Sequence, residues 1–528
     1  MTTPANKEKT LAVFSLLLFY LLLVIRNAWI SDDAMITFRV VENFLAGYGL
    51  GYNPFVRVQV FTHPLWMFSI SILYFVTRLF APSAPNALFY VTFFLSIFLS
   101  GFSIYLLLSR IEQNGLLSIV LAALMLGLSG AYVDFSTSGL ENPLTHFLLV
   151  LFVLVYLREK QNLFLLSLLF SLIMLNRMDT FILTAPALVH AWWISGQMKQ
   201  GIIKVAEGLV PFAIWELFSV FYYGFPFPNT AYAKLSTGIP SMVLIQQGGD
   251  YLLNSVNWDP ILMFAIGFAG VTLCLDRRDK FVALYVGVLL YMAYVVKIGG
   301  DFMSGRFLTA PLLLSVVIVS SQSAFRRGRL VALGVAVLLG AFSLRSPLLA
   351  SNMVLYLPEY PIGDLNGISD QRLYYFGNPR EGQFNSLVES GFREAWFGSP
   401  YAGEKWYFMG FRKVIFAEAL GKIGYEKGPN FYMTDNYALS DPLLARLPVT
   451  KKYWQIGHFR RDLPEGYYET LETGENKIAD PDLALYYSKL NIVATGRLQD
   501  WNRILEIWKF NSGQYDYLLE QYVAQNTR

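Results

Sequence analysis

The sequence has little cysteine, little histidine and little charge. Its 528 residues include one cysteine and four histidines, and 15% of them are charged, whereas soluble domains average about 25%. One thiol can form neither an intramolecular disulfide nor a zinc site built on thiolates. The net charge of +3 is too small to indicate nucleic acid as a partner. Internal repeats, low-complexity tracts and the glycine fingerprint of nucleotide-binding loops are also absent.

Apolar residues are abundant instead: they make up 55% of the chain and form long runs. The first run, LAVFSLLLFYLLLVI at 11–25, is longer than the core of a signal peptide, and no small-residue cleavage site follows it. We therefore expect a retained transmembrane helix there. Ten further apolar segments predict an α-helical integral membrane protein with about eleven transmembrane helices; they cover 87–108, 116–133, 143–157, 163–175, 181–194, 205–223, 261–275, 281–296, 307–320 and 330–344.

One more apolar segment, at 65–79, decides the topology. If it does not cross the membrane and the N-terminus is inside, thirteen basic residues face the cytoplasm; if it crosses, the last eleven of them move outside, against the positive-inside rule. We therefore expect 65–79 to lie along the outer interface. The thirteen residues are Lys7, Lys9, Arg110, Arg158, Lys160, Lys199, Lys204, Arg277, Arg278, Lys280, Arg326, Arg327 and Arg329.

This topology places nearly every unusual polar motif on the outer side. The outer loops cover 31–64, 134–142, 176–180, 224–260 and 297–306. They contain SDDAMITFR, FTHPLW, STSGLENPL, NRMD, YYGFPFPNTAYAK and GGDFMSGRF. Charges at membrane depth cost about 2.5–3.5 kcal/mol each on insertion scales, so this concentration predicts an active site that opens on the outer face of the cytoplasmic membrane.

The composition changes near residue 345, which divides the chain into a transmembrane catalytic domain (1–345) and a soluble extracytoplasmic domain (346–528). Tyr, Trp, Gly and charged residues are common in the second part, and no further span occurs there. RKVIFAEALGKIGYEKG and RILEIWKFNSGQYDYLLEQYV have helical patterns, and KLNIVATG has the pattern of a strand. We expect a mixed α/β domain that binds the acceptor.

Asp32 and Asp33 follow the first span directly. One carboxylate, or Ser31, would suffice to cap a helix that starts near Ala34. Two carboxylates can divide the work, one binding a cation or orienting an acceptor and the other accepting a proton.

Further candidates lie in the same outer loops. His63 and Arg39 share the first loop with the aspartates. His63 could bind phosphate or a metal or serve only structure, and Arg39 could bind an anion or face lipid headgroups. Glu141 opens a helix, where the helix dipole also favours a carboxylate. Arg177 and Asp179 are either an ion pair or contacts to sugar and phosphate.

Two later loops add cations. Asn229 and Lys234 belong to a loop rich in proline and aromatic residues, which suit a groove the size of a sugar. Asp301 and Arg306 flank GGDFMSGR, where the glycines permit close backbone approach and the arginine can bind phosphate with two nitrogens.

In this order, the motifs resemble the GT-C glycosyltransferases, membrane enzymes that use polyprenyl-phosphate sugars, and more narrowly the AftB-like (ZomB-type) arabinofuranosyltransferases. The resemblance covers most of the chain. It is carried by Asp32-Asp33-Ala34, ENFLAGYGLGYNP, THPLW, SGLENPL, NRMD, PNTAYAK, GGDFMSGRFL, DNYALSDPLLARLP and IGHFRRDLPEGY.

The resemblance implies a donor such as decaprenyl-phosphoryl-arabinofuranose and a cell-envelope glycan or glycoprotein acceptor. It also implies that an early-loop aspartate, Asp33 or Asp32, is the catalytic base. No metal ligand set is assigned; a divalent cation at the leaving phosphate is an open alternative. Two other classes stay open as well: a flippase for lipid-linked sugars, and a non-enzymatic envelope protein that supports a surface machine.

Overall fold

The computed structural model describes residues 4–82, 84, 86–111, 115–196, 198–235, 237–321, 326–343, 345–348, 366–376, 406–411, 413–449 and 454–526. The chain divides into two compact units. We call Met1–Ser31, Thr92–Phe212 and Pro240–Trp396 the helical unit, and Asp32–Val91, Ala213–Ile239 and Phe397–Arg528 the mixed unit. The sequence-based division has one boundary, after residue 345. Each compact unit is instead made of three separate segments of the chain.

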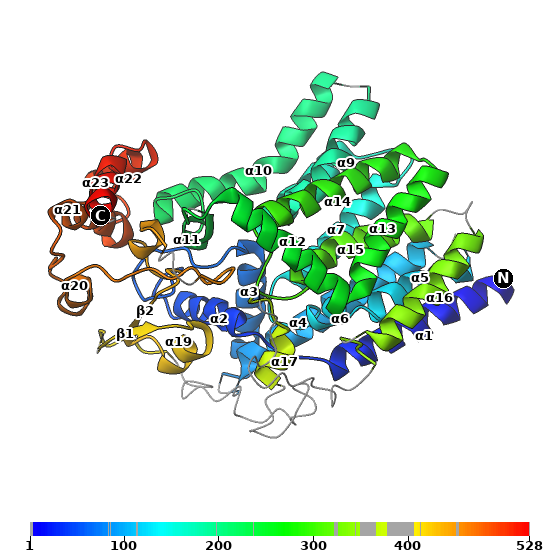
Figure 1. Cartoon of the computed structure of the whole chain (residues 1–528), viewed down its shortest axis with the longest axis horizontal. Coiled ribbons are helices and arrows are strands. Elements are labelled where there is room, and N and C mark those ends of the chain that lie inside the picture. Colours follow the sequence, from blue (N-terminus) through cyan, green and yellow to red (C-terminus); the bar gives the residue numbers. More distant parts are fainter. Residues whose placement is uncertain are drawn as a thin grey trace. The chain divides into compact units, whose positions relative to one another are not determined.

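The helical unit is a bundle in which α9 packs on α14, α13 on α15 and α7 on α8 (Figure 1). A helix lies over each of the eleven segments predicted from apolar runs. The elements are α1 (Pro4–Arg26), α4 (Ala87–Ile111), α5 (Leu116–Gly127), α6 (Gly130–Asp134), α7 (Asn142–Tyr156), α8 (Leu163–Asn176), η2 (Met178–Thr180), α9 (Phe181–Ile194), α10 (Met198–Tyr223), α12 (Ser241–Trp258), α13 (Pro260–Leu275), α14 (Asp279–Lys297), η3 (Arg306–Leu308), α15 (Thr309–Ser321), α16 (Arg326–Phe342) and α17 (Gln371–Phe376). The first residues of α4 and the last of α10 belong to the mixed unit.

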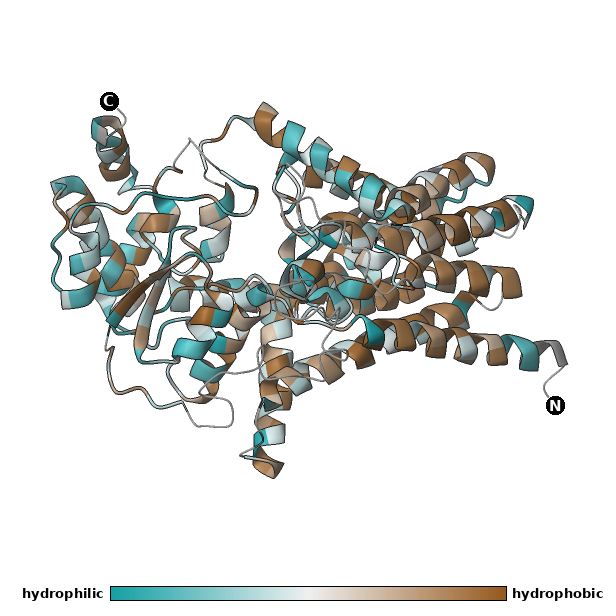
Figure 2. Cartoon of the chain, turned by 60° about the horizontal axis from the view of Figure 1, so that its bottom comes forward, coloured by the Kyte–Doolittle hydropathy of each residue, from teal (hydrophilic) through white to brown (hydrophobic). Residues whose placement is uncertain are grey.

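Apolar helices of this kind identify an α-helical membrane protein, and Figure 2 shows the helices of the bundle as predominantly hydrophobic. Among the described residues, four helices are long and apolar enough to cross a membrane: Lys7–Arg26, Ala87–Ile111, Met198–Tyr223 and Asp279–Lys297. The pair α12 and α13 bends by 104° at its break and adds a fifth candidate, and five further apolar helices have 10–17 residues. The count of eleven spans stays a prediction.

Buried ion pairs hold the segment after α16 against α6. Asp134 accepts hydrogen bonds from Arg345 Nη2 at 3.0 Å and from Arg372 Nε at 2.8 Å. Arg345 Nε also lies 2.5 Å from Asp370 Oδ2. A buried charge is tolerated only where it is paired and hydrogen-bonded, so these contacts fix Arg345, Asp370 and Arg372 against Asp134 of α6.

The mixed unit combines two early helices with the C-terminal region. Its two strands are parallel, with Lys413 opposite Phe431 and Ala417 opposite Asp435, and α19 connects them. Arg503 donates hydrogen bonds to the carbonyl oxygens of Phe221 and Tyr222 at 2.8 and 2.7 Å, which ties α22 to the end of α10. The elements are α2 (Asp32–Leu45), α3 (Pro64–Phe80), α11 (Asn229–Leu235), β1 (Lys413–Ala417), α19 (Gly421–Lys427), β2 (Phe431–Asp435), η4 (Leu444–Arg446), α20 (Tyr467–Thr473), α21 (Pro481–Thr495), α22 (Trp501–Asn511) and α23 (Asp516–Asn526).

One local prediction for the C-terminal region is wrong, and a second is correct only in part. KLNIVATG lies within α21, because its buried residues Leu490, Val493 and Ala494 have helical spacing and pack inside the unit. The segment RKVIFAEALGKIGYEKG forms strand β1 before the short helix α19, since the β-branched Val414 and Ile415 pair with β2. The helical pattern predicted for RILEIWKFNSGQYDYLLEQYV is confirmed, and the segment forms two helices, α22 and α23.

Helix α3 covers the segment predicted to lie along the outer interface. Trp66, Met67 and Ile70 are buried on one side, and Val76 and Phe80 are exposed. This two-sided pattern suits an interfacial helix, and its placement relative to the membrane stays a prediction.

Candidate functional site

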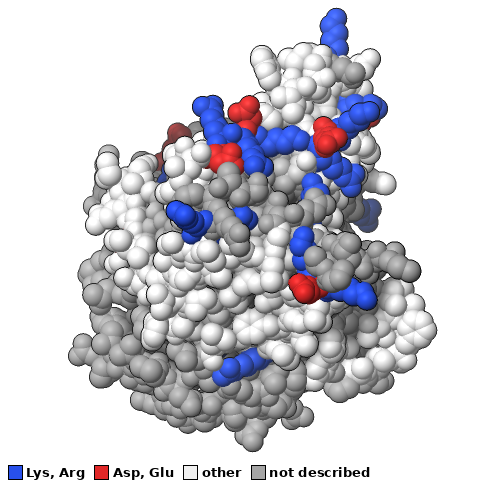
Figure 3. Space-filling model, turned by 90° about the vertical axis from the view of Figure 1, so that its right-hand side faces the viewer, with Lys and Arg blue, Asp and Glu red and all other residues white. Residues whose placement is uncertain are grey.

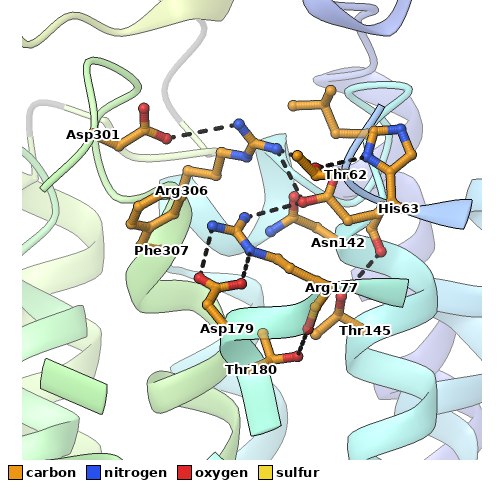
Figure 4. Close-up of polar contacts among 12 residues, drawn as sticks. Thr62, His63, Asn142, Thr145, Arg177, Asp179, Thr180, Asp301, Arg306 and Phe307 are labelled. Carbon is orange, nitrogen blue, oxygen red and sulfur yellow. Dashed lines mark hydrogen bonds and ion pairs between the residues drawn. The ribbon is translucent and has the colours of Figure 1, made fainter. Parts of the chain in front are cut away.

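In the helical unit, five predicted site residues form one cluster at the ends of α7, α8, α14 and α15. We call Glu141, Arg177, Asp179, Asp301 and Arg306 the arginine–carboxylate cluster (Figure 4). The chain brings them together from three loops, because the helices that carry them pack side by side.

Glu141 lies at the centre of the cluster. It precedes α7 and is 1% exposed. Its Oε1 accepts a hydrogen bond from Arg177 Nη1 at 3.0 Å, and Arg306 Nη2 donates to Oε1 and Oε2 at 3.0 and 3.2 Å. One buried carboxylate therefore orients two guanidinium groups.

Arg177 is held from a second side by Asp179. Its Nε and Nη2 donate to the two oxygens of Asp179 at 2.7 and 3.1 Å, the bidentate geometry that strengthens such a pair. Tyr291 donates to the same carboxylate at 3.2 Å, and the guanidinium lies 4.2 Å from the centre of the Phe307 ring. Sequence analysis missed Tyr291 and Phe307, since an aromatic residue in an apolar helix or beside a motif carries no signal of this contact.

Arg306 reaches Asp301 across the glycine loop. Arg306 Nη1 lies 3.7 Å from Asp301 Oδ2. Gly300 has a φ of +76°, and a Cβ there would lie 2.5 Å from the side chain of Tyr251. A residue with a side chain would be strained at this φ, so the glycine permits the turn that places Asp301 beside Arg306.

The cluster is mostly buried, and its most exposed members are Asp179, at 15%, and the two arginines. Arg306 and Arg177 have side chains that are 12% and 13% exposed, whereas the Glu141 carboxylate behind them is 1% exposed. Three carboxylates and two guanidinium groups leave a formal charge of −1. The carboxylates set the orientation of the two arginines, and the binding of a donor phosphate at the cluster stays a prediction.

In the mixed unit, the two early aspartates differ in their surroundings. Asp32 is buried, and its two oxygens accept the backbone N–H groups of Gly421 at 3.0 Å and Lys422 at 2.8 Å, at the start of α19. Burial raises the pKa of Asp32 to about 6, although the hydrogen bond from Lys422 opposes this and the Asp33 charge adds to it. Asp33 is half-buried, and no hydrogen bond or ion pair joins its carboxylate to another residue in the described ranges. Asp32 thus holds α19, and a role of Asp33 toward a substrate stays a prediction.

The other predicted residues of the first loop are engaged within the unit. His63 lies 2.9 Å from the Thr37 hydroxyl through Nε2 and 3.4 Å from the Thr62 hydroxyl through Nδ1. Arg39 is 0% exposed and donates to the carbonyl oxygens of Tyr52, Gly424 and Phe431. Both side chains therefore have structural contacts within the mixed unit. A role of either residue in binding the donor stays a prediction.

The loop that carries Asn229 and Lys234 joins the C-terminal region. Asn229 Nδ2 donates to the carbonyl oxygens of Ala438, Leu439 and Asp441 at 2.9, 3.1 and 3.0 Å, so it fixes that loop. Lys234, on α11, is half-buried.

A buried carboxylate that sequence analysis did not assign to the site also lies in the mixed unit. Glu42 accepts a hydrogen bond from Tyr74 at 2.8 Å and one from Tyr425 at 3.4 Å, and Arg78 lies 3.6 Å away. Burial raises the pKa of Glu42 to about 7. In the sequence it is an acidic residue in the apolar pattern of α2 and the first residue of the motif ENFLAGYGLGYNP.

The described residues contain no group of three or more His, Cys, Asp and Glu side chains arranged to hold a metal ion. The divalent cation considered for the leaving phosphate therefore stays an untested alternative.

Comparison with known proteins identifies two relatives, both named terminal beta-(1->2)-arabinofuranosyltransferase. The protein from Mycobacterium tuberculosis is 27% identical over 344 residues, which are 54% of this chain and 51% of the relative. The protein from Corynebacterium glutamicum is 28% identical over 345 residues, which are 55% of this chain and 48% of the relative. The chain thus spans about half the length of the curated relatives it matches.

No protein-family model and no solved structure matches the chain. The resemblance to AftB-like arabinofuranosyltransferases that the motifs indicate is confirmed by the two relatives.

Proposed function

We propose that this protein is a GT-C-type membrane glycosyltransferase that transfers arabinofuranose from a polyprenyl-phosphate donor to a cell-envelope glycan or glycoprotein. The observation that carries the proposal is the similarity to two arabinofuranosyltransferases. We place the reaction at the outer face of the cytoplasmic membrane, because the polar motifs lie in the loops that the positive-inside rule assigns to that side.

In this proposal Asp33 is the general base. A base must be able to reach the proton that it accepts, and the oxygens of Asp32 are already occupied by two backbone N–H groups. Asp33 takes the proton of the acceptor hydroxyl. The acceptor oxygen then forms the new bond to the anomeric carbon of the sugar.

The leaving group is the polyprenyl phosphate, which keeps the electron pair of the broken carbon–oxygen bond. Negative charge grows on its phosphate as the bond breaks, and guanidinium groups stabilise such charge best when their position is set beforehand. Arg306 and Arg177 meet this condition, because Glu141 and Asp179 orient them. A single displacement inverts the anomeric centre; retention would require a second displacement.

Transfer can be tested with purified protein, radiolabelled polyprenyl-phosphoryl-arabinofuranose and an arabinan acceptor. We expect Asp33→Asn to lower kcat by about 100-fold or more, the usual contribution of a general base. Asp32→Asn should instead lower the apparent Tm, because its amide cannot accept both N–H groups of α19. Asp482→Asn, at another half-buried aspartate outside the site, is the matched control.

Two outcomes would contradict the proposal. Full transfer activity in Asp33→Asn would exclude it as the base. Movement of the labelled lipid across the membrane without a new glycosidic bond, in the wild-type protein, would indicate a flippase.

A further inference from the structure

A second polar region lies at the far ends of the helices that carry the arginine–carboxylate cluster. Helices α7, α9 and α15 begin at the cluster, and α14 ends beside it. They have 15, 14, 13 and 19 residues respectively, so their opposite ends are roughly 20–28 Å away at 1.5 Å per residue. Those opposite ends line a cavity of about 510 Å³.

Basic residues outnumber acidic ones in the lining of this cavity. Arg110, Arg278 and Lys280 line it, together with His190 and a single carboxylate, Asp279. Figure 3 shows the face of the molecule where these helix ends lie, and Lys and Arg outnumber Asp and Glu there. By the positive-inside rule this is the cytoplasmic face.

The donors in the cavity suit a phosphate group. Lys280 Nζ donates to the carbonyl oxygen of Arg158 at 2.7 Å, which uses one of the three N–H groups of an ammonium. Arg278 lies 3.2 Å from Asp276 through Nη2, and a guanidinium has five N–H donors. Both cations can therefore keep these contacts and still bind phosphate oxygens.

The apolar surface beside the cavity indicates a lipid rather than a soluble phosphate. Ile194 lines the cavity and is 50% exposed. On the same helix, α9, Val189 and Trp193 are 58% and 69% exposed. Tryptophan is enriched at the membrane interface, so acyl chains could lie along α9 while the headgroup enters the cavity.

We propose that this cavity binds the phosphate headgroup of an anionic phospholipid from the cytoplasmic leaflet. Its volume lies within the range of about 300–1,000 Å³ that is usual for ligand pockets, and basic pockets between transmembrane helices on this side bind such headgroups in other proteins. A bound headgroup neutralises the cations at the ends of α4 and α14 and contacts α9. The site lies at the opposite helix ends from the proposed reaction and does not depend on that function.

Binding can be measured on the full chain in detergent by native mass spectrometry with phosphatidylglycerol, with phosphatidylcholine as the uncharged comparison. The test variant is Arg110→Gln/Arg278→Gln/Lys280→Gln. The matched control is Lys199→Gln/Lys204→Gln/Arg277→Gln, which removes the same number of charges from the same face outside the cavity lining. We expect the test variant to lose about tenfold or more in phosphatidylglycerol affinity, since each basic residue near a lipid surface contributes about 1 kcal/mol, and the control to lose less than about threefold.

A second variant keeps the proposal testable if the triple variant does not fold. Ile194→Trp places a larger side chain at the cavity wall without a change of charge and should lower phosphatidylglycerol binding as well. Equal losses in the test and control triple variants would show that only the charge of the face matters, and would overturn the site. If soluble glycerol phosphate binds as tightly as phosphatidylglycerol, the ligand is a free phosphate compound and the lipid assignment is wrong.

Discussion

At the scale of single residues, neighbours in the chain have different surroundings. Asp32 and Asp33 have the same chemistry, yet one is buried against α19 and the other is half-buried. Glu141 shows the same principle, because its carboxylate holds arginines that are 36 and 165 residues away. The role of a carboxylate therefore depends on which donors face it after folding.

Glu42 allows a prediction about pH. Since burial raises its pKa to about 7, the folded protein holds this proton more tightly than the unfolded chain, whose Glu has a pKa of about 4.3. The contribution of Glu42 to stability is thus largest below about pH 4.3 and falls as pH rises to about 7. We expect Glu42→Gln to reduce the loss of apparent Tm between pH 5 and pH 8, by the equivalent of about 1–3 kcal/mol.

Thermal unfolding in detergent at the two pH values tests this. Glu475→Gln, at an exposed carboxylate, is the control and should leave the pH dependence unchanged. If Glu42→Gln and the wild-type protein lose the same Tm between pH 5 and pH 8, Glu42 does not titrate in this range.

At the scale of elements, the loop between α14 and α15 shows how a motif becomes a geometry. The Tyr251 hydroxyl donates to the carbonyl oxygen of Met303 and accepts the N–H of Phe307, both at 3.2 Å. Gly300 turns against the same tyrosine. The loop is therefore packed around one side chain, which fixes Asp301 and Arg306.

Gly300→Ala tests the packing of this loop. The positive φ and the approach of Cβ to Tyr251 should cost about 1–3 kcal/mol of stability and displace Arg306. We expect a lower apparent Tm and, if the proposed function holds, a higher KM for the lipid donor. Gly334→Ala, where no atom lies within 4 Å of the added Cβ, is the matched control and should leave the Tm unchanged or raise it. An unchanged Tm in Gly300→Ala would show that the loop adapts.

At the scale of the whole molecule, the order of the chain and its compact units do not coincide. The mixed unit takes Asp32–Val91 and Ala213–Ile239 together with Phe397–Arg528. Hydrogen bonds such as those from Asn53 Nδ2 to the carbonyl oxygen of Met433 and from the N–H of Met433 to Asn53 Oδ1, both at 2.9 Å, join the early and late segments. A division by composition alone could not find this arrangement, because composition changes along the chain and not in space.

The predicted topology can be tested by cysteine labelling. In a Cys274→Ser background, Glu475→Cys should react with a membrane-impermeant maleimide in intact cells, and Lys160→Cys only after permeabilisation. Both positions are exposed, so access depends on the side of the membrane. Labelling of Lys160→Cys in intact cells would show that the predicted topology is reversed and that the basic cavity lies at the outer face.

The sequence by itself determined the membrane class, the positions of eleven apolar segments that are helical, and the set of polar motifs that resembles arabinofuranosyltransferases; helix α12 was not among these segments. These features follow from residue type and local spacing, which are properties of short segments. Only the tertiary structure decided that Asp32 caps α19, that Glu141 lies between two arginines and that basic helix ends enclose a cavity. Each of these depends on contacts between residues far apart in the chain, and no local pattern encodes them.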